Sequence, residues 1–365
     1  EDGKGNVWIG TYKEGISVYN LKTKKFTHLR HNANASSLAN NSVWALHKDK
    51  KGNIWVGTDA GLDLYNEQTN SFIHQNISNK KQKVAWISED SKGNLWLGLL
   101  SVVAVFEPEA GSVSTIRVQG SCFYEDAKGR RWLASRNDGL ILLGANNKPA
   151  KYYDERDGLP NNQVFQILED KTKNLWLSTA NGLARFDPAT ESFTNYDKRD
   201  GLQNNQFHYG AAFKLTSGEL VFGGVNGFNI FDPGKVARNN FKPPVVLTDL
   251  KIFNKSVRIN DQFNVLENSI SESQKISIPY QYNILTFEFS ALNFVRPEKN
   301  KYKFRMIGFD KNWNEAGATP TATYTNLDPG KYTFAVIASN NDNQWNDNGL
   351  QIQIEILPPV WKTWG

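Results

Sequence analysis

The chain has 365 residues, a formal net charge of +5, and 11 Trp, 21 Phe and 13 Tyr residues. This length allows two or three domains with a sizeable core, and the many aromatic residues are typical of an all-β protein. The single cysteine, Cys122, excludes an intramolecular disulfide and a cysteine-based metal cluster. No apolar run approaches the roughly 18–20 residues that a membrane-spanning helix needs.

The positive charge alone allows an anionic partner, such as an acidic glycan or a nucleic acid. Several lysines, however, fall in expected hairpin turns, where they would only solvate strand edges: Lys4, Lys51, Lys92, Lys128 and Lys173. No basic block is interleaved with aromatic residues, as a nucleic-acid groove would require. We therefore expect no bound nucleic acid, and binding of an acidic ligand stays open as an alternative.

One motif recurs along the first two thirds of the chain. The copy at residues 49–58 reads Asp-Lys-Lys-Gly-Asn-Ile-Trp-Val-Gly-Thr and is followed by Gly61-Leu62 and Tyr65. A sixth, altered copy carries Phe222 in the expected tryptophan position, and the other copies carry Trp8, Trp55, Trp96, Trp132 and Trp176. A repeat of about 40–45 residues that is rich in short strands is typical of a propeller blade.

Each repeat is predicted to form four strands. An alternating apolar strand, at residues 42–47 in the second copy, leads into an Asp-x-x-Gly-Asn turn in which Gly supplies the positive φ. The tryptophan strand comes next, then a Gly-Leu strand that ends in an aromatic residue, then a Thr-x-x-Phe strand. We expect the tryptophans to pack as wedges between sheets, and the preceding aspartates to be turn residues: Asp49, Asp90, Asp126 and Asp170.

The chain is expected to begin inside a blade, because the turn at residues 2–5 normally follows a first strand that is missing here. Repeats continue to Pro233, so an incomplete β-propeller with six repeat motifs is predicted for residues 1–238, as the C-terminal part of a larger array. The turn at 171–174 lacks the usual Gly, the Trp132 repeat is short, and the linker at 31–41 is long and rich in Asn and Ser.

The pattern changes at Pro243-Pro244, which is a linker signal. Six or seven alternating strands in about a hundred residues indicate an immunoglobulin- or fibronectin-like β-sandwich over residues 239–357. Its strands are expected at 245–250, 276–278, 284–289, 302–307, 332–338 and 352–356.

Two turns of this second region carry specific predictions. The Leu-Asp-Pro-Gly turn at 327–330 is predicted to close a hairpin. The Asn- and Asp-rich segment 340–347 is predicted to be a turn and not a calcium loop, because its spacing does not fit the twelve-residue pattern.

The chain ends with Pro358-Pro359 followed by Trp361, Lys362 and Trp364. Tryptophans and a lysine in such a group resemble the interfacial belt of a membrane protein. Residues 358–365 are therefore expected to be a juxtamembrane segment, with a membrane helix beginning beyond Gly365.

In a propeller, the loop that enters the innermost strand and the loop after the tryptophan strand lie on one face, where polar and aromatic groups can meet. A sugar needs aromatic faces with planar polar side chains beside them, and this face offers both. We predict ligand contacts from Tyr12, Trp44, Arg136, Asn162, Gln163, Gln206 and His208. The alternative is that the Asn and Gln side chains there only satisfy turn backbone.

The repeat Asp-x-x-Gly-Asn-Leu-Trp-Leu-Gly-Thr…Gly-Leu…Tyr resembles the regulator-propeller repeat of bacterial two-component sensors. The altered copy at 223–233 resembles the closing repeat of such arrays. The region that follows resembles the triple-tyrosine module, with Tyr302, Tyr324 and Tyr332 at the naming positions. This resemblance covers nearly the whole chain in the expected order.

The resemblance implies the periplasmic sensor region of a hybrid two-component system, as found in gut Bacteroidetes. Such proteins carry two propellers, this sandwich, one membrane helix, and then histidine kinase, receiver and DNA-binding parts. They sense glycan-derived oligosaccharides and switch on polysaccharide-utilisation genes. For this chain we expect an oligosaccharide ligand, a homodimer through the sandwich and a parent chain that spans the inner membrane, with no catalysis, cofactor or metal in this segment.

Two other functions stay open. A propeller lyase or glycosidase would need paired carboxylates facing one cavity or a histidine or tyrosine base. The loops offer Glu14, Asp59, Asp138, His208 and Tyr209, which form no motif. A protein-interaction scaffold is the remaining alternative, because propellers commonly serve that role.

Overall fold

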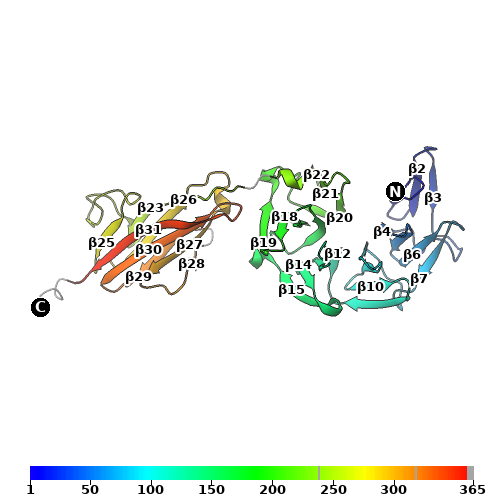
Figure 1. Ribbon diagram of the computed structural model, residues 1–365, viewed down its shortest axis with the longest axis horizontal. Coiled ribbons are helices and arrows are strands. Elements are labelled where there is room, and N and C mark those ends of the chain that lie inside the picture. The colour runs from blue at the N-terminus through cyan, green and yellow to red at the C-terminus, as the bar shows by residue number, and fades with distance from the viewer. Residues whose placement is uncertain (237–238, 317–318, 360–365) are drawn as a thin grey trace. The chain divides into compact units, whose positions relative to one another are not determined.

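The computed structural model describes residues 1–236, 239–316 and 319–359, which form two units, Glu1–Val236 and Ala237–Gly365 (Figure 1). The predicted all-β class is confirmed, since the helical elements in the described ranges are single turns: η1 (Ala145–Asn147), η2 (Glu155–Asp157), η3 (Lys198–Asp200), η4 (Pro233–Lys235) and η5 (Pro297–Lys299). None of the described helices is long and apolar enough to cross a membrane. Of the segment predicted to be juxtamembrane, residues 360–365 lie outside the described residues.

The first unit consists of six antiparallel sheets that follow one another around an arc (Figure 1). Sheet 1 contains β1 (Asn6–Gly10), β2 (Ile16–Asn20) and β3 (Phe26–Leu29). Sheet 2 contains β4 (Val43–Lys48), β5 (Ile54–Thr58), β6 (Gly61–Asn66) and β7 (Ser71–Gln75). Sheet 3 contains β8 (Trp86–Glu89), β9 (Leu95–Gly98), β10 (Val103–Glu107) and β11 (Ser112–Ile116).

The other three sheets continue the arc. Sheet 4 contains β12 (Gly120–Glu125), β13 (Arg131–Ser135), β14 (Leu140–Leu143) and β15 (Pro149–Tyr153). Sheet 5 contains β16 (Val164–Glu169), β17 (Leu175–Thr179), β18 (Gly182–Asp187) and β19 (Ser192–Tyr196). Sheet 6 contains β20 (Phe207–Lys214), β21 (Leu220–Gly224) and β22 (Gly227–Phe231).

The unit is an incomplete propeller, as predicted. Sheets 2 to 5 have four strands each, whereas sheet 1 lacks the innermost strand of the repeat and sheet 6 lacks the outermost one within residues 1–236. The innermost strands β4, β8, β12, β16 and β20 are each in contact with the next. The loops that lead into these strands therefore come together on one face of the propeller unit.

The repeated tryptophans lie between neighbouring sheets, which confirms their expected role as wedges. Every tryptophan of the repeat contacts a ring of the following sheet, with centroids 3.8–6.1 Å apart. Four of the indoles are no more than 3% exposed: Trp55, Trp96, Trp132 and Trp176. The aromatic partners are Tyr65, Phe106, Phe123, Phe186 and Phe231.

The aspartate that begins each turn binds the tryptophan six residues later. Asp49 Oδ1 accepts the backbone N–H groups of Lys51 and Asn53, and its Oδ2 accepts the Asn53 amide and the Trp55 indole N–H. The distance from aspartate Oδ2 to indole Nε1 is 2.8–3.2 Å in all five copies. These aspartates are structural turn residues, as predicted.

The same hydrogen bonds set the charge state of the carboxylates. Burial acts to raise the pKa of Asp2, but hydrogen bonds from Trp8, Asn6 and Lys4 outweigh it and lower that pKa to about 2. The pKa of Asp49, Asp126 and Asp170 is lowered for the same reason. A carboxylate that accepts several hydrogen bonds is favoured in its charged form, so the turn stays intact at neutral pH.

Sheet 6 lacks both members of this pair. Leu215 occupies the position of the aspartate. Its N–H donates to the carbonyl oxygen of Glu219, just as the N–H of Asp170 donates to the carbonyl oxygen of Asn174. In the matching register, Val221 and not Phe222 corresponds to the tryptophan. The prediction that placed Phe222 there is wrong by one residue. A valine has no side-chain N–H, so an aspartate in this turn would have no indole to bind.

The second unit is a sandwich of two sheets, with strand orders β24-β23-β26-β29 and β25-β31-β30-β27-β28. The six predicted strands are present as β23 (Val245–Ile252), β25 (Lys275–Pro279), β26 (Ile284–Ala291), β27 (Lys301–Ile307), β30 (Gly330–Ser339) and β31 (Trp345–Leu357). The sequence missed β24 (Lys255–Ser256), β28 (Asn314–Glu315) and β29 (Thr321–Thr325). Stacked rings such as Phe287 and Phe334, 4.4 Å apart, fill the space between the sheets.

The turn at 327–330 does not close a hairpin, so that prediction is wrong. It leads from β29, which pairs with β26, to β30, which pairs with β27 and β31 in the other sheet. A Pro-Gly turn signal is local and cannot decide which partner a strand selects. The turn predicted at 340–347 is present at 340–344, where Asn340 Oδ1 accepts the N–H groups of Asp342 and Gln344, whereas residues 345–347 belong to β31.

The three tyrosines of the motif brace the sandwich through their hydroxyl groups. Tyr302 accepts the N–H of Ala291, and Tyr324 donates to Asp310 Oδ2 at 2.6 Å. Tyr332 donates to the carbonyl of Asp328, in the turn between the two sheets. Each ring packs on the core while its polar end ties down a loop or a strand end.

Replacing Asp170 by alanine is expected to lower the free energy of unfolding by about 1–3 kcal/mol, because the buried Trp176 and Asn174 donors lose their acceptor. Burial raises the pKa of Asp170, but hydrogen bonds led by that of Trp176 lower it below 3.8. The stability that the ionised Asp170 contributes is therefore fully present above its unfolded-state pKa, and it is lost as the pH falls through its folded-state pKa. Urea unfolding at about pH 7 and about pH 3 measures both effects.

Asp187→Ala is the matched control, because Asp187 lies in the same sheet and accepts a single backbone N–H, that of Ala189. We expect a much smaller loss for this variant. Equal losses for the two variants would contradict the role of the aspartate–tryptophan hydrogen bond.

Lys173 occupies the turn position that the other repeats fill with glycine, and its φ of 70° is left-handed. Lys173→Gly is expected to raise the free energy of unfolding by about 0.5–1 kcal/mol, since relief of backbone strain exceeds the added chain entropy. Chemical denaturation checks the gain. The control is Lys92→Gly, at a turn position whose φ is not positive, and this change is expected to destabilise the protein. If Lys92→Gly also raised the free energy of unfolding, the strain argument would be wrong.

Candidate functional site

The innermost strands begin irregularly, and this turns side chains toward one face of the propeller unit. Register shifts fall between Val43 and Ala45 in β4, between Val164 and Gln166 in β16, and between Phe207 and Ala212 in β20. A bulge leaves its extra residue out of the ladder and redirects its side chain. The residues freed in this way include Trp44, Phe165 and Tyr209.

Side chains from all six sheets gather on this face. Trp44, Phe165 and Tyr209 come from the bulges, Lys83 lies three residues before β8, and the others follow the tryptophan strands β1, β5 and β13. We call this set the rim cluster: Tyr12, Trp44, Asp59, Lys83, Arg136, Phe165 and Tyr209.

Trp44 is the centre of one half of the rim cluster. Its indole N–H donates to Asp59 Oδ1 at 2.7 Å. The ring of Tyr12 meets it edge-on, with 5.6 Å between the ring centroids. The ammonium group of Lys83 lies over the indole face, 2.9 Å from its centroid.

Tyr209 is the centre of the other half. The guanidinium carbon of Arg136 lies 4.8 Å from the centroid of the Tyr209 ring, and Phe165 meets that ring edge-on at 4.4 Å. Burial lowers the pKa of Lys83, Asp59 acts against this, and the charge of Arg136 lowers it further. The charge of Arg136 thus acts on Lys83, and the opposite charge of Asp59 acts on it more strongly.

The rim cluster is accessible on its aromatic side and electrostatically unbalanced. Tyr12, Trp44 and Tyr209 are 63%, 43% and 46% exposed, whereas Lys83 and Arg136 are half-buried. Neither of these two cations forms an ion pair with a residue of the described ranges. The arrangement offers ring surfaces beside two free positive charges, which suits a polar ligand.

The predicted site residues separate into two groups in the structure. Tyr12, Trp44 and Arg136 come together in the rim cluster. Asn162 is engaged in its own turn, where its Oδ1 accepts the N–H of Glu155 at 3.0 Å and its N–H bonds Glu155 Oε1 at 3.1 Å. For this residue the alternative of a turn side chain agrees with the geometry.

Gln163, Gln206 and His208 are exposed at the beginnings of β16 and β20. They stay predicted ligand contacts. Lys83 was missed, although it stands seven residues before the turn aspartate Asp90, as Gln163 stands seven residues before Asp170. Alignment of the repeats at this position would have found it.

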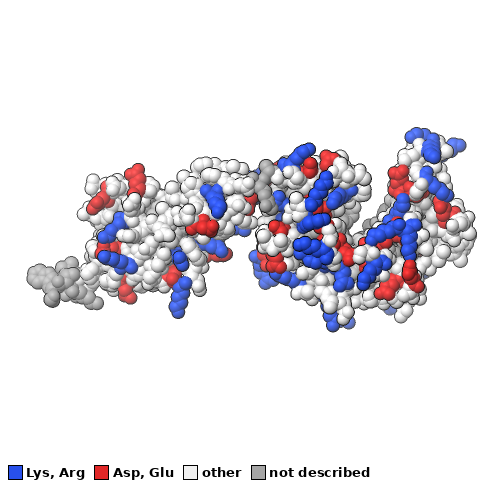
Figure 2. Space-filling view, in the orientation of Figure 1, with Lys and Arg blue, Asp and Glu red and all other residues white. Residues whose placement is uncertain are grey.

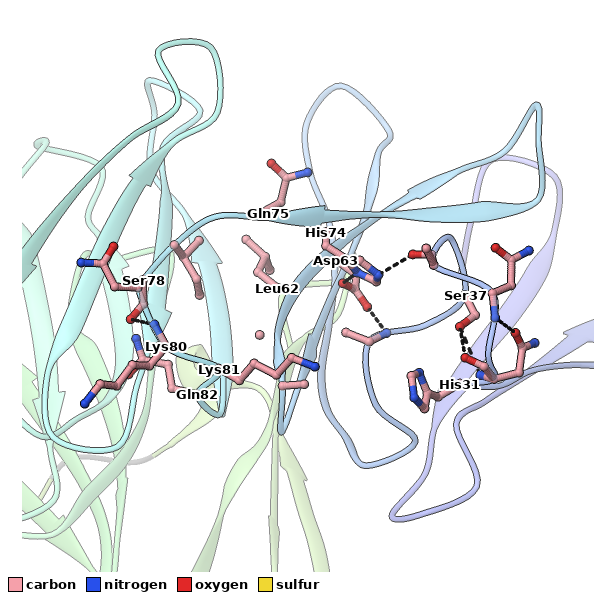
Figure 3. A pocket seen from close by; sticks show the side chains of 18 of the residues that line it. His31, Ser37, Leu62, Asp63, His74, Gln75, Ser78, Lys80, Lys81 and Gln82 are labelled. Carbon is pink, nitrogen blue, oxygen red and sulfur yellow. Dashed lines mark hydrogen bonds and ion pairs between the residues drawn. The ribbon is translucent and has the colours of Figure 1, made fainter.

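A hollow of about 660 Å³ lies beside sheet 2, between the linker that carries His31 and Ser37 and the one that carries Ser78 and Lys80 (Figure 3). Asp63 is fully buried there, and its Oδ1 lies 2.6 Å from His74 Nδ1. Its Oδ2 accepts the N–H of Ala39 at 2.8 Å.

This buried pair holds the long linker in place. His74 Nε2 lies 2.9 Å from the carbonyl oxygen of Ala35, so the ring connects Asp63 to the linker. Burial raises the pKa of Asp63, against the hydrogen bonds from His74 and Ala39. We therefore assign these residues a structural role, because every polar atom of the pair already has a partner in the fold.

The carboxylates considered for catalysis do not form a pair. Glu14 pairs with Arg30 at 2.8 Å, Asp59 accepts the Trp44 indole, and Asp138 accepts the hydroxyl group of Ser135 at 2.9 Å. They belong to three different loops, after β1, β5 and β13. A glycosidase needs two carboxylates across one bond, and these three do not provide that geometry.

Most of the basic charge is dispersed. Figure 2 shows lysines and arginines interspersed with acidic residues on the face in view. Many of them form ion pairs on the outside of the unit, for example Lys51 with Glu109 and Lys151 with Glu191. This agrees with the expectation that turn lysines mainly solvate strand edges.

Comparison with known families matches both units. Residues 37–60 and 158–181 match the two component regulator propeller, and residues 293–357 match the Y_Y_Y domain, which includes the three bracing tyrosines. The propeller, the sandwich and these matches define a sensor region of the two-component type. The chain thus carries regulator-propeller repeats followed by a Y_Y_Y domain.

Individual relatives agree with these matches. The chain is 30% identical to histidine kinase P4 of Formosa agariphila over 359 residues, which is 98% of this chain and 24% of that protein. It is 26% identical to the extracellular domain of the hybrid two component system BT3049 from B. thetaiotaomicron, with a TM-score of 0.75 over 98% of this chain and 49% of that one. The chain thus spans about a quarter and about half of their lengths.

A more distant structure shares the fold alone. PorZ, a surface component of the type-IX secretion system of Porphyromonas gingivalis, is 15% identical, with a TM-score of 0.51 over 98% of this chain and 51% of that one.

Proposed function

We propose that the chain is the ligand-binding part of a hybrid two-component sensor and that it binds a glycan-derived oligosaccharide at the rim cluster. The observation that carries this proposal is the convergence of side chains from all six sheets on one face. A ligand that contacts several sheets at once can change their positions relative to one another. A sensor needs such a coupling between ligand binding and the shape of the domain. Exposed rings beside planar polar groups suit the apolar face and the hydroxyl groups of a sugar.

The place of the domain in the signalling chain is part of the same proposal. The relatives are extracellular domains of hybrid two component systems and a histidine kinase. We infer a periplasmic position, a homodimer through the sandwich, a membrane helix after it, and control of polysaccharide-utilisation genes. A ligand can shift such a dimer only if it binds one arrangement more tightly than the other.

Calorimetric titration of the complete extracellular region with oligosaccharides of different charge and linkage tests ligand binding. Trp44→Ala and Tyr12→Ala are each expected to weaken the affinity for a bound oligosaccharide by at least about tenfold, or about 1.4 kcal/mol. The control is Tyr152→Ala, whose ring is 50% exposed on the outermost strand β15. If the control weakens binding as much as the rim variants, the site lies elsewhere.

Cysteine crosslinking between sandwiches tests transmission. The native Cys122 does not interfere, because burial raises the pKa of its thiol to about 12. With Ser271→Cys, at an exposed position of the sandwich, a saturating ligand is expected to change the yield of crosslinked dimer in the full-length protein. A yield that is the same with and without bound ligand would rule out transmission through a rearranged dimer.

A further inference from the structure

We propose that the ligand of the rim cluster is acidic: an oligosaccharide whose carboxylate or sulfate group is bound between Lys83 and Arg136. This inference rests on the proposed function and adds the chemical class of the sugar. It is carried by two half-buried cations of different sheets that lie on rings of the rim cluster and form no ion pair with a residue of the described ranges.

Asp59 attracts Lys83 electrostatically without forming an ion pair with it, and Asp138 forms no ion pair with Arg136. Asp59 accepts the Trp44 indole N–H, and Asp138 accepts the Ser135 hydroxyl group and lies in the same loop as Arg136. Lys83 and Arg136 lie instead on the faces of Trp44 and Tyr209. A ring face stabilises a cation only modestly, and it does not remove the repulsion between two of them.

Several other basic side chains of the propeller unit, although not all of them, pair with carboxylates. Arg130 bonds Asp126 at 2.7 Å, and Arg30 bonds Glu14 at 2.8 Å. Lys83 and Arg136 form no ion pair with a residue of the described ranges, on the face where loops of all six sheets converge. Unneutralised charge in a partly desolvated position is unfavourable in the free protein, and an anionic ligand would remove that penalty on binding.

The chemistry of the two side chains fits one acidic group. The guanidinium of Arg136 can present two parallel N–H donors to a carboxylate or sulfate, and Lys83 adds a point charge from the other side. The exposed ring of Tyr12, with Lys13 Nζ 5.1 Å from its centroid, provides a neighbouring apolar face for the sugar ring. The specificity would then come from a local charge pair and not from the diffuse net charge of +5.

Calorimetry with matched probes tests the inference on the complete extracellular region. Trigalacturonic acid is compared with its methyl ester, and a chondroitin sulfate tetrasaccharide with its desulfated form, so that each pair differs in charge and keeps the sugar backbone. A neutral panel of galacto-, xylo- and malto-oligosaccharides is titrated alongside. We expect binding of at least one acidic probe, at least tenfold weaker binding of its uncharged form, and weaker binding as salt rises.

The variants are Lys83→Gln, Arg136→Gln and, as a control with the same change in net charge, Lys148→Gln at an exposed position after η1. Each rim variant is expected to weaken the acidic probe at least tenfold, whereas the control leaves its affinity unchanged. Without ligand, Lys83→Gln is expected to raise the unfolding midpoint, because it removes a charge that is partly buried and close to that of Arg136. A purely structural role for Lys83 would lower that midpoint.

The outcomes separate this inference from the proposed function. Binding of neutral oligosaccharides alone, or equal binding of an acid and its ester, overturns the acidic ligand and leaves oligosaccharide sensing in place. Binding of an acidic probe that neither rim variant weakens places the anion site elsewhere and refutes the role of Lys83 and Arg136. No binding by any oligosaccharide of either kind overturns both.

Discussion

The propeller unit depends on one repeated contact, in which a turn carboxylate accepts the N–H of a tryptophan indole buried between two sheets. A ring large enough to fill that space brings a polar N–H into the interior, where it needs an acceptor. The aspartate provides one without any further element, because the turn already holds its carboxylate above the strand. Local turn geometry and packing between sheets thus become a single interaction, and each repeat can position the next.

Sheet 6 shows how closely the two parts are linked. Where the tryptophan position holds Val221, the turn begins with Leu215. That sheet packs on its neighbour through Phe207, Phe222 and Phe231. The polar tie is therefore present only where an indole has to be satisfied.

The strand ends opposite the turns are free of this constraint, and the candidate site lies there. Bulges at the beginnings of the innermost strands release Trp44, Phe165 and Tyr209 from their ladders, at the end where the entering loops meet. Loops on a rigid scaffold commonly carry function. Several cations on the outside of the unit form ion pairs, while Lys83 and Arg136 on the site face form none with a residue of the described ranges.

The sequence by itself determined the repeat, the all-β class, the sandwich with most of its strands, and the face of the propeller that carries Tyr12, Trp44 and Arg136, because these follow from local periodicity and loop order. Only the tertiary structure decided the pairing of β29 and β30 with strands of different sheets, the alignment of Val221 with the tryptophans, and the approach of Lys83 to Arg136. These depend on which distant residues meet, since hydrogen bonds between strands and repulsion between charges act through space. A repeat pattern reports the unit that recurs, and the contacts between units appear only when the chain is folded.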